Sequence, residues 1–315
     1  MTTFSDGVYQ FGGVPVSSSG QLPMFTGNAW FVNSVIGSDG NSGKKPGQPF
    51  ATVAAAVTAA TASNDDVIYV MSGHSETITS ATSFGSLSKA GISIVGLGFG
   101  SRRPTFTFTT AATARINVTA NNVTIRNCLF IANFADVATC FLNNAGAEMQ
   151  IIGCEFRDTS SILNFLAIVT NTVTVNSDGL TFNQNKVFGA GTTAATTPIK
   201  LAGAVSRLTV NDNYINLAIL NNTSALIAHA ALVMTNAEVA RNKIFRPNTD
   251  TATGGIIIST TSTTNTGMVY DNYVQAADVA AAILCTAGSV YGMFNNLYDG
   301  DADASGFVLP AIGVN

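Results

Sequence analysis

One eight-residue unit recurs along the chain, and its regular spacing constrains the fold more than any other feature. In each copy, one apolar residue stands three positions before a shared position and another stands two positions after it. Successive copies lie 24 to 31 residues apart, a period typical of stacked repeats. The shared position is held by Cys128, Cys154, Asn185, Asn213, Asn242, Asn272 and Asn296.

A second apolar column runs through the later part of the chain with nearly the same period. It is formed by Ile199, Ile227, Ile257 and Ile283, at intervals of 28, 30 and 26 residues. Two columns with one common period indicate a coil with several strands per turn, in which each coil buries its apolar face against the next. The pattern therefore predicts an all-β parallel solenoid. The alternative is a β-sandwich with Asn in its turns.

The Asn and Cys column is expected to lie inside the solenoid, where the chain turns. A buried amide can hydrogen-bond to its equivalents on the coils above and below, which satisfies its donors and its acceptor. Cys can fill the same position as a small apolar residue. At the spacing of neighbouring strands, about 4.8 Å, these side chains would form a continuous ladder.

The segments that flank the repeats define the expected domain organisation. Residues 29–65 contain a strand-like run, a turn-rich loop and an Ala-rich helix over 50–63, and should cap the open end of the solenoid, residues 66–298. Residues 1–28 and 299–315 mix Gly, Ser and Pro with apolar residues, as expected for an arm and a tail that dock on a partner or on the solenoid itself. The candidate contact residues of the arm are Phe4, Tyr9, Phe11, Met24 and Phe25.

Several runs resemble the pectate-lyase-like right-handed β-helix superfamily. PFATVAAAV and DVIYVMSG follow a strand and a Gly/Asp/Asn loop as in the entry segment of that superfamily, and LTFNQNKV and LTVNDNYI are similar to its repeat. The resemblance covers about residues 30–298 and implies a right-handed, single-stranded parallel β-helix. The superfamily includes lyases, hydrolases, phage tailspikes and non-catalytic virion proteins, so the resemblance does not choose among these functions.

The composition excludes several classes of partner. Charged residues make up 10% of the chain and the formal net charge is −4, so the basic face of a nucleic-acid-binding protein is not expected. No run approaches the roughly 18 apolar residues of a membrane span. The four Cys form no CxxC pair, which argues against a zinc site. No cofactor is expected.

The best enzymatic constellation stands immediately before the shared position, on side chains expected to point outward. Asp212, Arg241 and Asp271 occupy this position on three successive coils. The carboxylates would lie about 9–10 Å apart at strand spacing, near the roughly 9.5 Å limit of an inverting glycosidase pair. Because Arg241 would favour the ionised form of both, neither suits the role of general acid. The favoured interpretation is a stabilising charge ladder; the alternative is a polysaccharide lyase or glycoside hydrolase.

One position after the shared position, two outward interactions are expected. Glu155 can pair with Lys186 on the next coil. Lys243 stands between Tyr214 and Tyr273, an arrangement that favours a cation–π stack. Aromatic side chains on the outside of a solenoid could also bind sugar.

A weak metal candidate lies at the end of the repeats. Asp299, Asp301 and Asp303 form a D-x-D-x-D run of oxygen ligands that could suit Ca²⁺. Ala304 replaces the Gly of an EF-hand loop, so a solvated turn without metal is the expected state.

These observations favour a non-enzymatic structural protein of a phage virion, a capsid decoration or cement protein that attaches through its arms and stabilises or projects from the shell. The expected partners are further copies of the chain, as a homotrimer, and the major capsid protein or other virion proteins. The N-terminus shows no export-signal pattern, so the expected location is the virion, assembled in the host cytoplasm. The alternative is a tailspike or receptor-binding protein that binds or degrades cell-surface carbohydrate.

Overall fold

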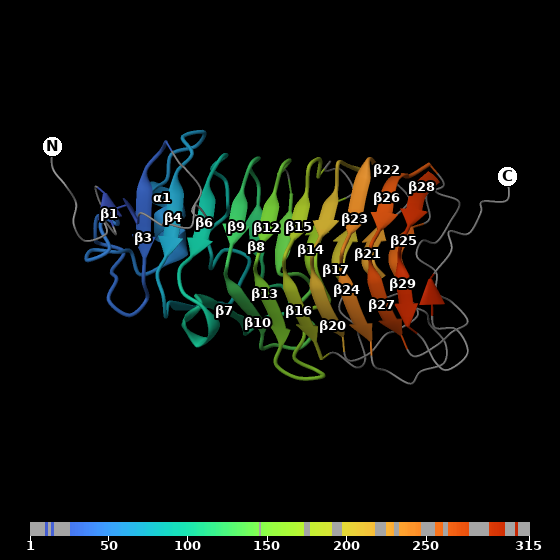
Figure 1. Ribbon diagram of the computed structural model, residues 1–315. Coiled ribbons are helices and arrows are strands. Elements are labelled where there is room, and N and C mark those ends of the chain that lie inside the picture. The colour runs from blue at the N-terminus through green and yellow to red at the C-terminus, as the bar shows by residue number, and fades with distance from the viewer. Residues whose placement is uncertain are drawn as a thin grey trace, which may run out of the picture.

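The computed structural model confirms a right-handed parallel β-helix, elongated along the axis on which its coils stack (Figure 1). The structure describes residues 26–144, 146–172, 177–190, 197–217, 225–229, 233–246, 256–260, 264–276 and 290–299, and the backbone of three two-residue strands. Of the expected arm and tail residues, Phe4, Tyr9, Met24, Phe25, Asp301 and Asp303 lie outside the described residues, as do the side chains of Phe11 and Asp299.

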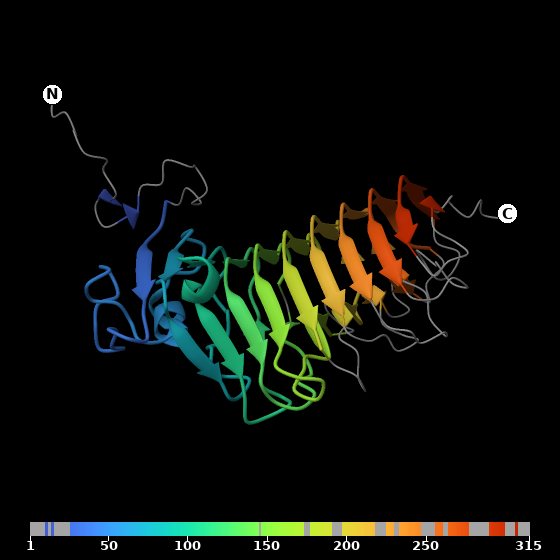
Figure 2. The same ribbon diagram turned by 60° about the horizontal axis from the view of Figure 1, so that its bottom comes forward.

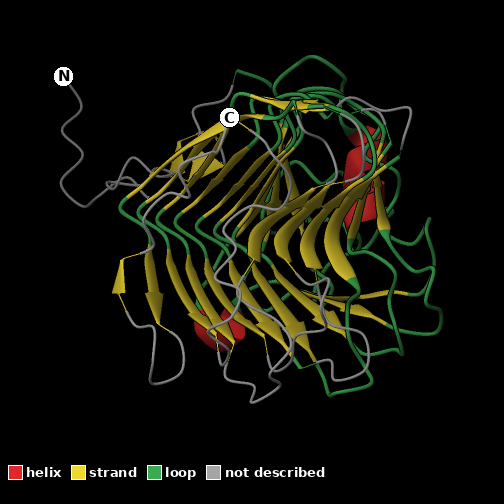
Figure 3. Ribbon diagram, turned by 90° about the vertical axis from the view of Figure 1, so that its right-hand side faces the viewer, coloured by secondary structure: helices red, strands yellow, loops and turns green. Residues whose placement is uncertain are grey.

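Three sheets wind around one interior, as the view along the axis shows (Figure 3). Sheet I contains β3 (Ala29–Val32), β4 (Val67–Val70), β6 (Ser93–Gly96), β9 (Thr124–Arg126), β12 (Gln150–Ile152), β15 (Thr181–Asn183), β19 (Thr209–Asn211), β23 (Ala237–Ala240), β26 (Thr266–Tyr270) and β28 (Val290–Phe294). Sheet II contains β5 (Ser75–Ile78), β7 (Thr105–Phe108), β10 (Leu129–Ala132), β13 (Glu155–Asp158), β16 (Lys186–Gly189), β20 (Tyr214–Leu217), β24 (Lys243–Arg246), β27 (Tyr273–Ala276), β29 (Leu297–Asp299) and the antiparallel β30 (Gly306–Phe307). Sheet III contains β8 (Ile116–Val118), β11 (Phe141–Asn143), β14 (Ala167–Asn171), β17 (Thr197–Leu201), β21 (Ala225–His229) and β25 (Ile256–Thr260).

Five short elements complete the secondary structure of the described residues besides the capping helix. β1 (Gln10–Phe11) and β2 (Val14–Pro15) form an antiparallel pair. β18 (Val205–Ser206) and β22 (Met234–Thr235) form a parallel pair on neighbouring coils. The 3-10 helix η1 spans Gly100–Arg102.

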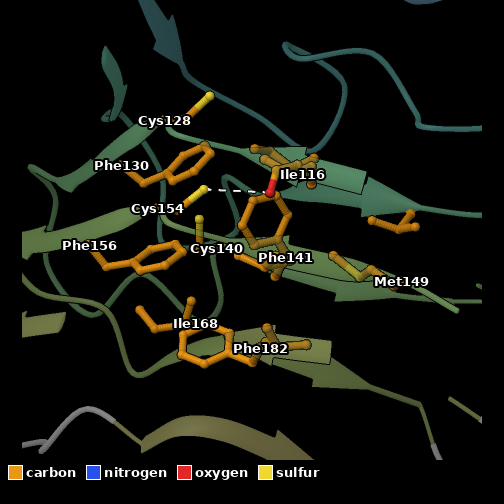
Figure 4. Close-up of a cluster of buried hydrophobic side chains, with 14 of the residues drawn as sticks. Ile116, Cys128, Phe130, Cys140, Phe141, Met149, Cys154, Phe156, Ile168 and Phe182 are labelled. Atoms are coloured by element: carbon orange, nitrogen blue, oxygen red, sulfur yellow. Dashed lines mark hydrogen bonds between the residues drawn. The ribbon is translucent and has the colours of Figure 1, made fainter. Parts of the chain in front are cut away.

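The interior is filled by columns of aromatic and aliphatic side chains, because inward positions on successive strands are in register. Phe106, Phe130 and Phe156 stack with ring centroids 5.4 and 5.3 Å apart. Phe182 of sheet I continues this stack at 5.9 Å. Figure 4 shows the buried free thiols of Cys128, Cys140 and Cys154 among these rings; Cys285 lies outside the described residues.

Sheet III carries the second apolar column, with one correction to its expected members. The register pairs Ile199 with Ile227 and Ile227 with Ile258. Ile258, not Ile257, therefore takes the inward position, where it is fully buried. The run of three isoleucines at 256–258 concealed a slip of one residue, which in a strand exchanges the two faces. Ile283 lies outside the described residues.

The capping helix α1 (Val53–Ala59) is shorter than the expected 50–63. Thr52 is extended, and its hydroxyl accepts a hydrogen bond from Ala55 N, so the helix begins at Val53. The Asp39 carboxylate accepts the backbone N–H groups of Ala51 and Thr52 at 2.9 and 3.0 Å, which fixes the entry to the helix. Figure 2 shows the helix at the N-terminal end of the solenoid. Its buried side chains extend the core there.

A buried carboxylate joins the cap to the first coil. Asp66, which directly precedes β4, accepts hydrogen bonds from Asn28 N, Trp30 Nε1, Thr61 N and Asn64 Nδ2 at 2.7 to 3.0 Å. Burial alone raises the pKa of Asp66, but these donors stabilise the charged form and lower the pKa to about 2. Asn28 is attached to the cap by these contacts, and Thr26 by a hydrogen bond from its hydroxyl to the Asp65 carboxylate at 3.3 Å, so a removable arm ends before residue 26.

Candidate functional site

The corner between sheets I and II is built from one residue with left-handed backbone geometry on each coil. Its φ values lie between 53° and 64°. A left-handed residue bends the chain sharply, and Gly, Asn and Asp adopt this geometry most readily. We name these residues the corner column: Asn127, Gly153, Gln184, Asp212, Arg241, Asp271 and Asn295.

Inside this corner, the side chains of Asn185, Asn213, Asn242, Asn272 and Asn296 lie in single file, and we name this set the Asn ladder. Each amide oxygen accepts the backbone N–H of the shared position on the preceding coil at 2.9 to 3.1 Å. Each Nδ2 donates to a backbone carbonyl of the preceding coil at 2.8 to 2.9 Å.

Further bonds link the amides of the ladder to one another. Nδ2 of Asn213, Asn242 and Asn272 also donates to Oδ1 of the next Asn at 2.8 to 2.9 Å. All five side chains are buried. The ladder therefore satisfies buried polar groups on every coil it crosses.

On the outside of the same corner, Arg241 forms an ion pair with Asp212, so two of the three candidate catalytic residues bind each other. Its Nε and Nη2 donate to the two carboxylate oxygens of Asp212 at 2.8 and 3.0 Å. These hydrogen bonds raise the pKa of the Arg241 guanidinium above its already high value. Asp271 accepts instead from Asn295 Nδ2 at 2.5 Å. Both carboxylate oxygens of Asp212 are therefore engaged by Arg241.

The outward face of sheet II differs from the expected pairings. Glu155 binds Arg103 at 2.8 Å and also pairs with Arg157, rather than with Lys186. Arg103 lies in the turn before β7, outside the repeat columns on which the prediction depended. Lys186 stands in register between Glu155 and Tyr214 and is exposed.

The expected stack around Lys243 is replaced by an aromatic stripe. Phe245 lies between Tyr214 and Tyr273, with ring centroids 5.1 and 5.6 Å away. Phe188 continues the contact to Tyr214 at 5.9 Å. Lys243 is exposed beside these rings. We name Phe188, Tyr214, Phe245 and Tyr273 the aromatic stripe; each is half-buried.

Two further groups of polar side chains lie outside the corner column. Arg207 binds Glu148 at 2.5 Å and Asp178 at 2.7 Å on a second corner of the coil. A signal for that corner exists, because Glu148, Gly179, Arg207 and Asn236 recur at 28 to 31 residues and all have positive φ. Buried His74 accepts Ser34 N at Nδ1, 3.0 Å away, and its Nε2 lies 3.2 Å from the Glu76 carboxylate. Ser34 offers its backbone rather than its hydroxyl, so this group is not a catalytic triad.

Neither a metal-binding cluster nor a membrane-spanning helix is found in the part of the chain that the structure describes. No three His, Cys, Asp or Glu residues there gather to hold a metal ion. No helix there is long and apolar enough to cross a membrane.

Comparison with known proteins yields only distant similarity. No protein-family model matches the chain, and no curated protein sequence matches it. A rhamnogalacturonan lyase is similar with a TM-score of 0.37 and 13% identity, over 90% of each chain. A GH136 lacto-N-biosidase from Eubacterium ramulus is similar with a TM-score of 0.42 and 8% identity, over 86% of this chain and 68% of that one. Similarity at this level supports no conclusion about activity.

Proposed function

We propose that the chain is a non-enzymatic structural protein of a phage virion, a capsid decoration protein that attaches through its terminal segments and stabilises or projects from the shell. The observation that carries this proposal is the bidentate Arg241–Asp212 ion pair, which ties together the best candidate catalytic side chains. The outward charges of the corner bind neighbouring coils, as in a surface that stabilises the fold.

The interior supports a mechanical role. The Asn ladder links five successive coils through buried hydrogen bonds, and the phenylalanine stack fills the coils before it. Buried networks whose donors and acceptors are all paired rigidify a structure. A rigid body of this kind suits a protein that projects from a shell.

A carbohydrate-binding tailspike or receptor-binding protein is the second candidate, and the aromatic stripe favours it. Half-exposed rings beside the cations Lys186, Lys243 and Arg157 could stack on sugars and attract acidic groups. Under this alternative, the chain would bind a bacterial surface polysaccharide without requiring the corner column.

The test combines particle imaging with a deletion. Virions purified from the phage that encodes the chain should contain it by mass spectrometry, and cryo-electron microscopy should place a β-helix on the capsid surface. A chain lacking residues 1–25 keeps Asn28 and its contacts with Asp66, so it should fold yet fail to bind particles that lack the native protein.

Three results would contradict the proposal. They are absence of the chain from purified virions, location at the tail, and cleavage of a host polysaccharide by the purified protein. The matched control for the deletion is the full-length chain, compared at equal concentration after circular dichroism has shown equal strand content.

A further inference from the structure

Exposed apolar side chains gather on both sides of the corner in the C-terminal coils. On sheet I, Met268 is 47% exposed and Phe294 is 50% exposed. The Phe294 ring stacks on Tyr270 with centroids 4.8 Å apart and an interplanar angle of 9°. On sheet II, the aromatic stripe is followed by Leu297, which is 42% exposed. Exposed apolar groups that cluster in this way mark interaction sites.

The cluster on sheet I is not a general property of that sheet. From β9 onward, one outward column runs through Thr124, Gln150, Thr181, Thr209 and Glu238 before it reaches Met268 and then Gly292. The neighbouring column ends in Tyr270 and Phe294 after Asn211 and Ala240. At the other end of sheet I, the outward side chains of Phe31, Tyr69 and Val95 are apolar but buried. Among the described residues of sheet I, the large apolar side chains that are exposed are therefore those of β26 and β28.

The two faces carry opposite charge. Sheet II presents Lys186 and Lys243 exposed, and the carboxylate of Glu155 is already matched by two arginines. On the other side stand Glu238 and Asp271. Among the described residues, no cation forms an ion pair with Glu238 or Asp271. Arg241 binds Asp212 instead.

We infer that the outward face of sheet II on one copy packs against the corner and the C-terminal part of sheet I on a second copy, in a closed ring of parallel solenoids. A two-fold pairing of sheet II with itself would oppose Lys243 to like charges, whereas contact between the two different faces brings opposite charges together. A contact between two different surfaces forms a ring of at least three copies when the rotation between copies closes, and an open filament when it does not.

Symmetry makes the contact specific. In a ring of parallel solenoids, the copies are related by rotation about an axis parallel to the solenoids. Such a rotation does not shift one copy along the axis relative to the next, so side chains at the same coil height meet. Lys243 follows β23 in the same coil as Glu238, and Asp271 lies one coil further on. One coil is about 4.8 Å, a distance that a lysine side chain spans. The aromatic residues of the two faces occupy these same coils.

The test measures the mass of the full chain in solution by light scattering and sedimentation, from 1 to 100 µM. The expected result is a closed oligomer of at least three 32.5 kDa copies, with trimer as the smallest. Lys243→Glu and Asp271→Lys should each weaken the association about tenfold or more, and the double variant should restore it. Phe294→Ser should also dissociate the ring. The matched control, Phe99→Ser, removes a ring that is 80% exposed near the N-terminal end and should leave the mass unchanged.

Several outcomes would overturn the inference. The first is that the full chain is monomeric at 100 µM. The second is that the Lys243→Glu and Phe294→Ser variants form an oligomer of unchanged mass, with circular dichroism spectra that show they are folded. A monomer whose aromatic stripe binds a uronic-acid polysaccharide would assign the surface to carbohydrate instead. The result is separable from the proposed function: a monomer present on capsids would refute only the ring, and a ring absent from virions would refute only the virion role.

Discussion

Replacing Asn213 by Leu tests the Asn ladder at a position that bonds in both directions. The Asn213 side chain accepts Asn185 N at 2.9 Å and donates to Phe182 O at 2.8 Å. It also donates to Asn242 Oδ1, which keeps its bond from Asn213 N. Leu therefore deprives two buried backbone groups of these partners, the Asn185 N–H and the Phe182 carbonyl.

The magnitude follows from those two groups. An unsatisfied buried donor or acceptor costs about 1–3 kcal/mol, so with two such groups the free energy of unfolding should fall by roughly 2–6 kcal/mol, less what the added apolar burial offsets. The assay is urea unfolding followed by circular dichroism, with the midpoint compared at an unchanged slope. Asn216→Ala, on the outward face of β20, the strand that begins directly after Asn213, is the matched control and should change stability by about 0.5 kcal/mol or less. An Asn213→Leu midpoint equal to that of the control would refute a hydrogen-bonded ladder.

Three further predictions concern the cap, the thiols and the corner. The pKa of Asp66 is lowered from 3.8 to about 2 in the folded protein. Its contribution to the free energy of unfolding, about 2 kcal/mol, is therefore present above pH 4 and is lost as the pH falls towards 2. Asp66→Asn should flatten the decline of melting temperature over this range, and an unchanged acid profile would contradict the network. Burial raises the pKa of Cys154 to about 12 and the pKa values of Cys128 and Cys140 well above their usual range. In a Cys285→Ser background, these three thiols should therefore resist a thiol reagent at pH 8 until urea unfolds the chain. Fast labelling of the folded protein would refute their burial. Asp212→Asn should lower the unfolding free energy by at most about 1 kcal/mol, as expected of an exposed pair; a larger loss in urea unfolding would show that the corner column bears more of the stability.

The sequence was informative wherever one residue type must repeat in register. The Asn ladder and the phenylalanine columns are periodic because each coil presents the same inward slot to the next. The slip at Ile257 shows the limit of this reasoning, because three consecutive isoleucines offer no internal marker of which one faces inward. The left-handed corner was also readable in principle from its Asn, Gly and Asp content.

The outward contacts were harder to predict, because they do not follow single columns. The stripe runs diagonally, so Phe245 contacts Tyr214 and Tyr273 from a position two residues along its own strand from Lys243. Arg103 reaches Glu155 from a turn that has no counterpart in the repeat. Comparing equal columns cannot find either contact, since each depends on side-chain length and on the path of a non-repeating turn.

The corner also changes how its carboxylates should be interpreted. The corner residue of each coil has a left-handed φ, which favours Asn, Asp and Gly. This backbone preference is enough to explain the presence of Asp212 and Asp271 without a catalytic role. Arg241 adopts the same φ, 55°, without that preference, and its bidentate bond to Asp212 supplies the compensation. A carboxylate pair at such a corner is therefore weak evidence for catalysis on a β-helix. Chemistry or recognition on this protein is better sought on the flat outward faces, where no backbone requirement explains the choice of Phe, Tyr and Lys.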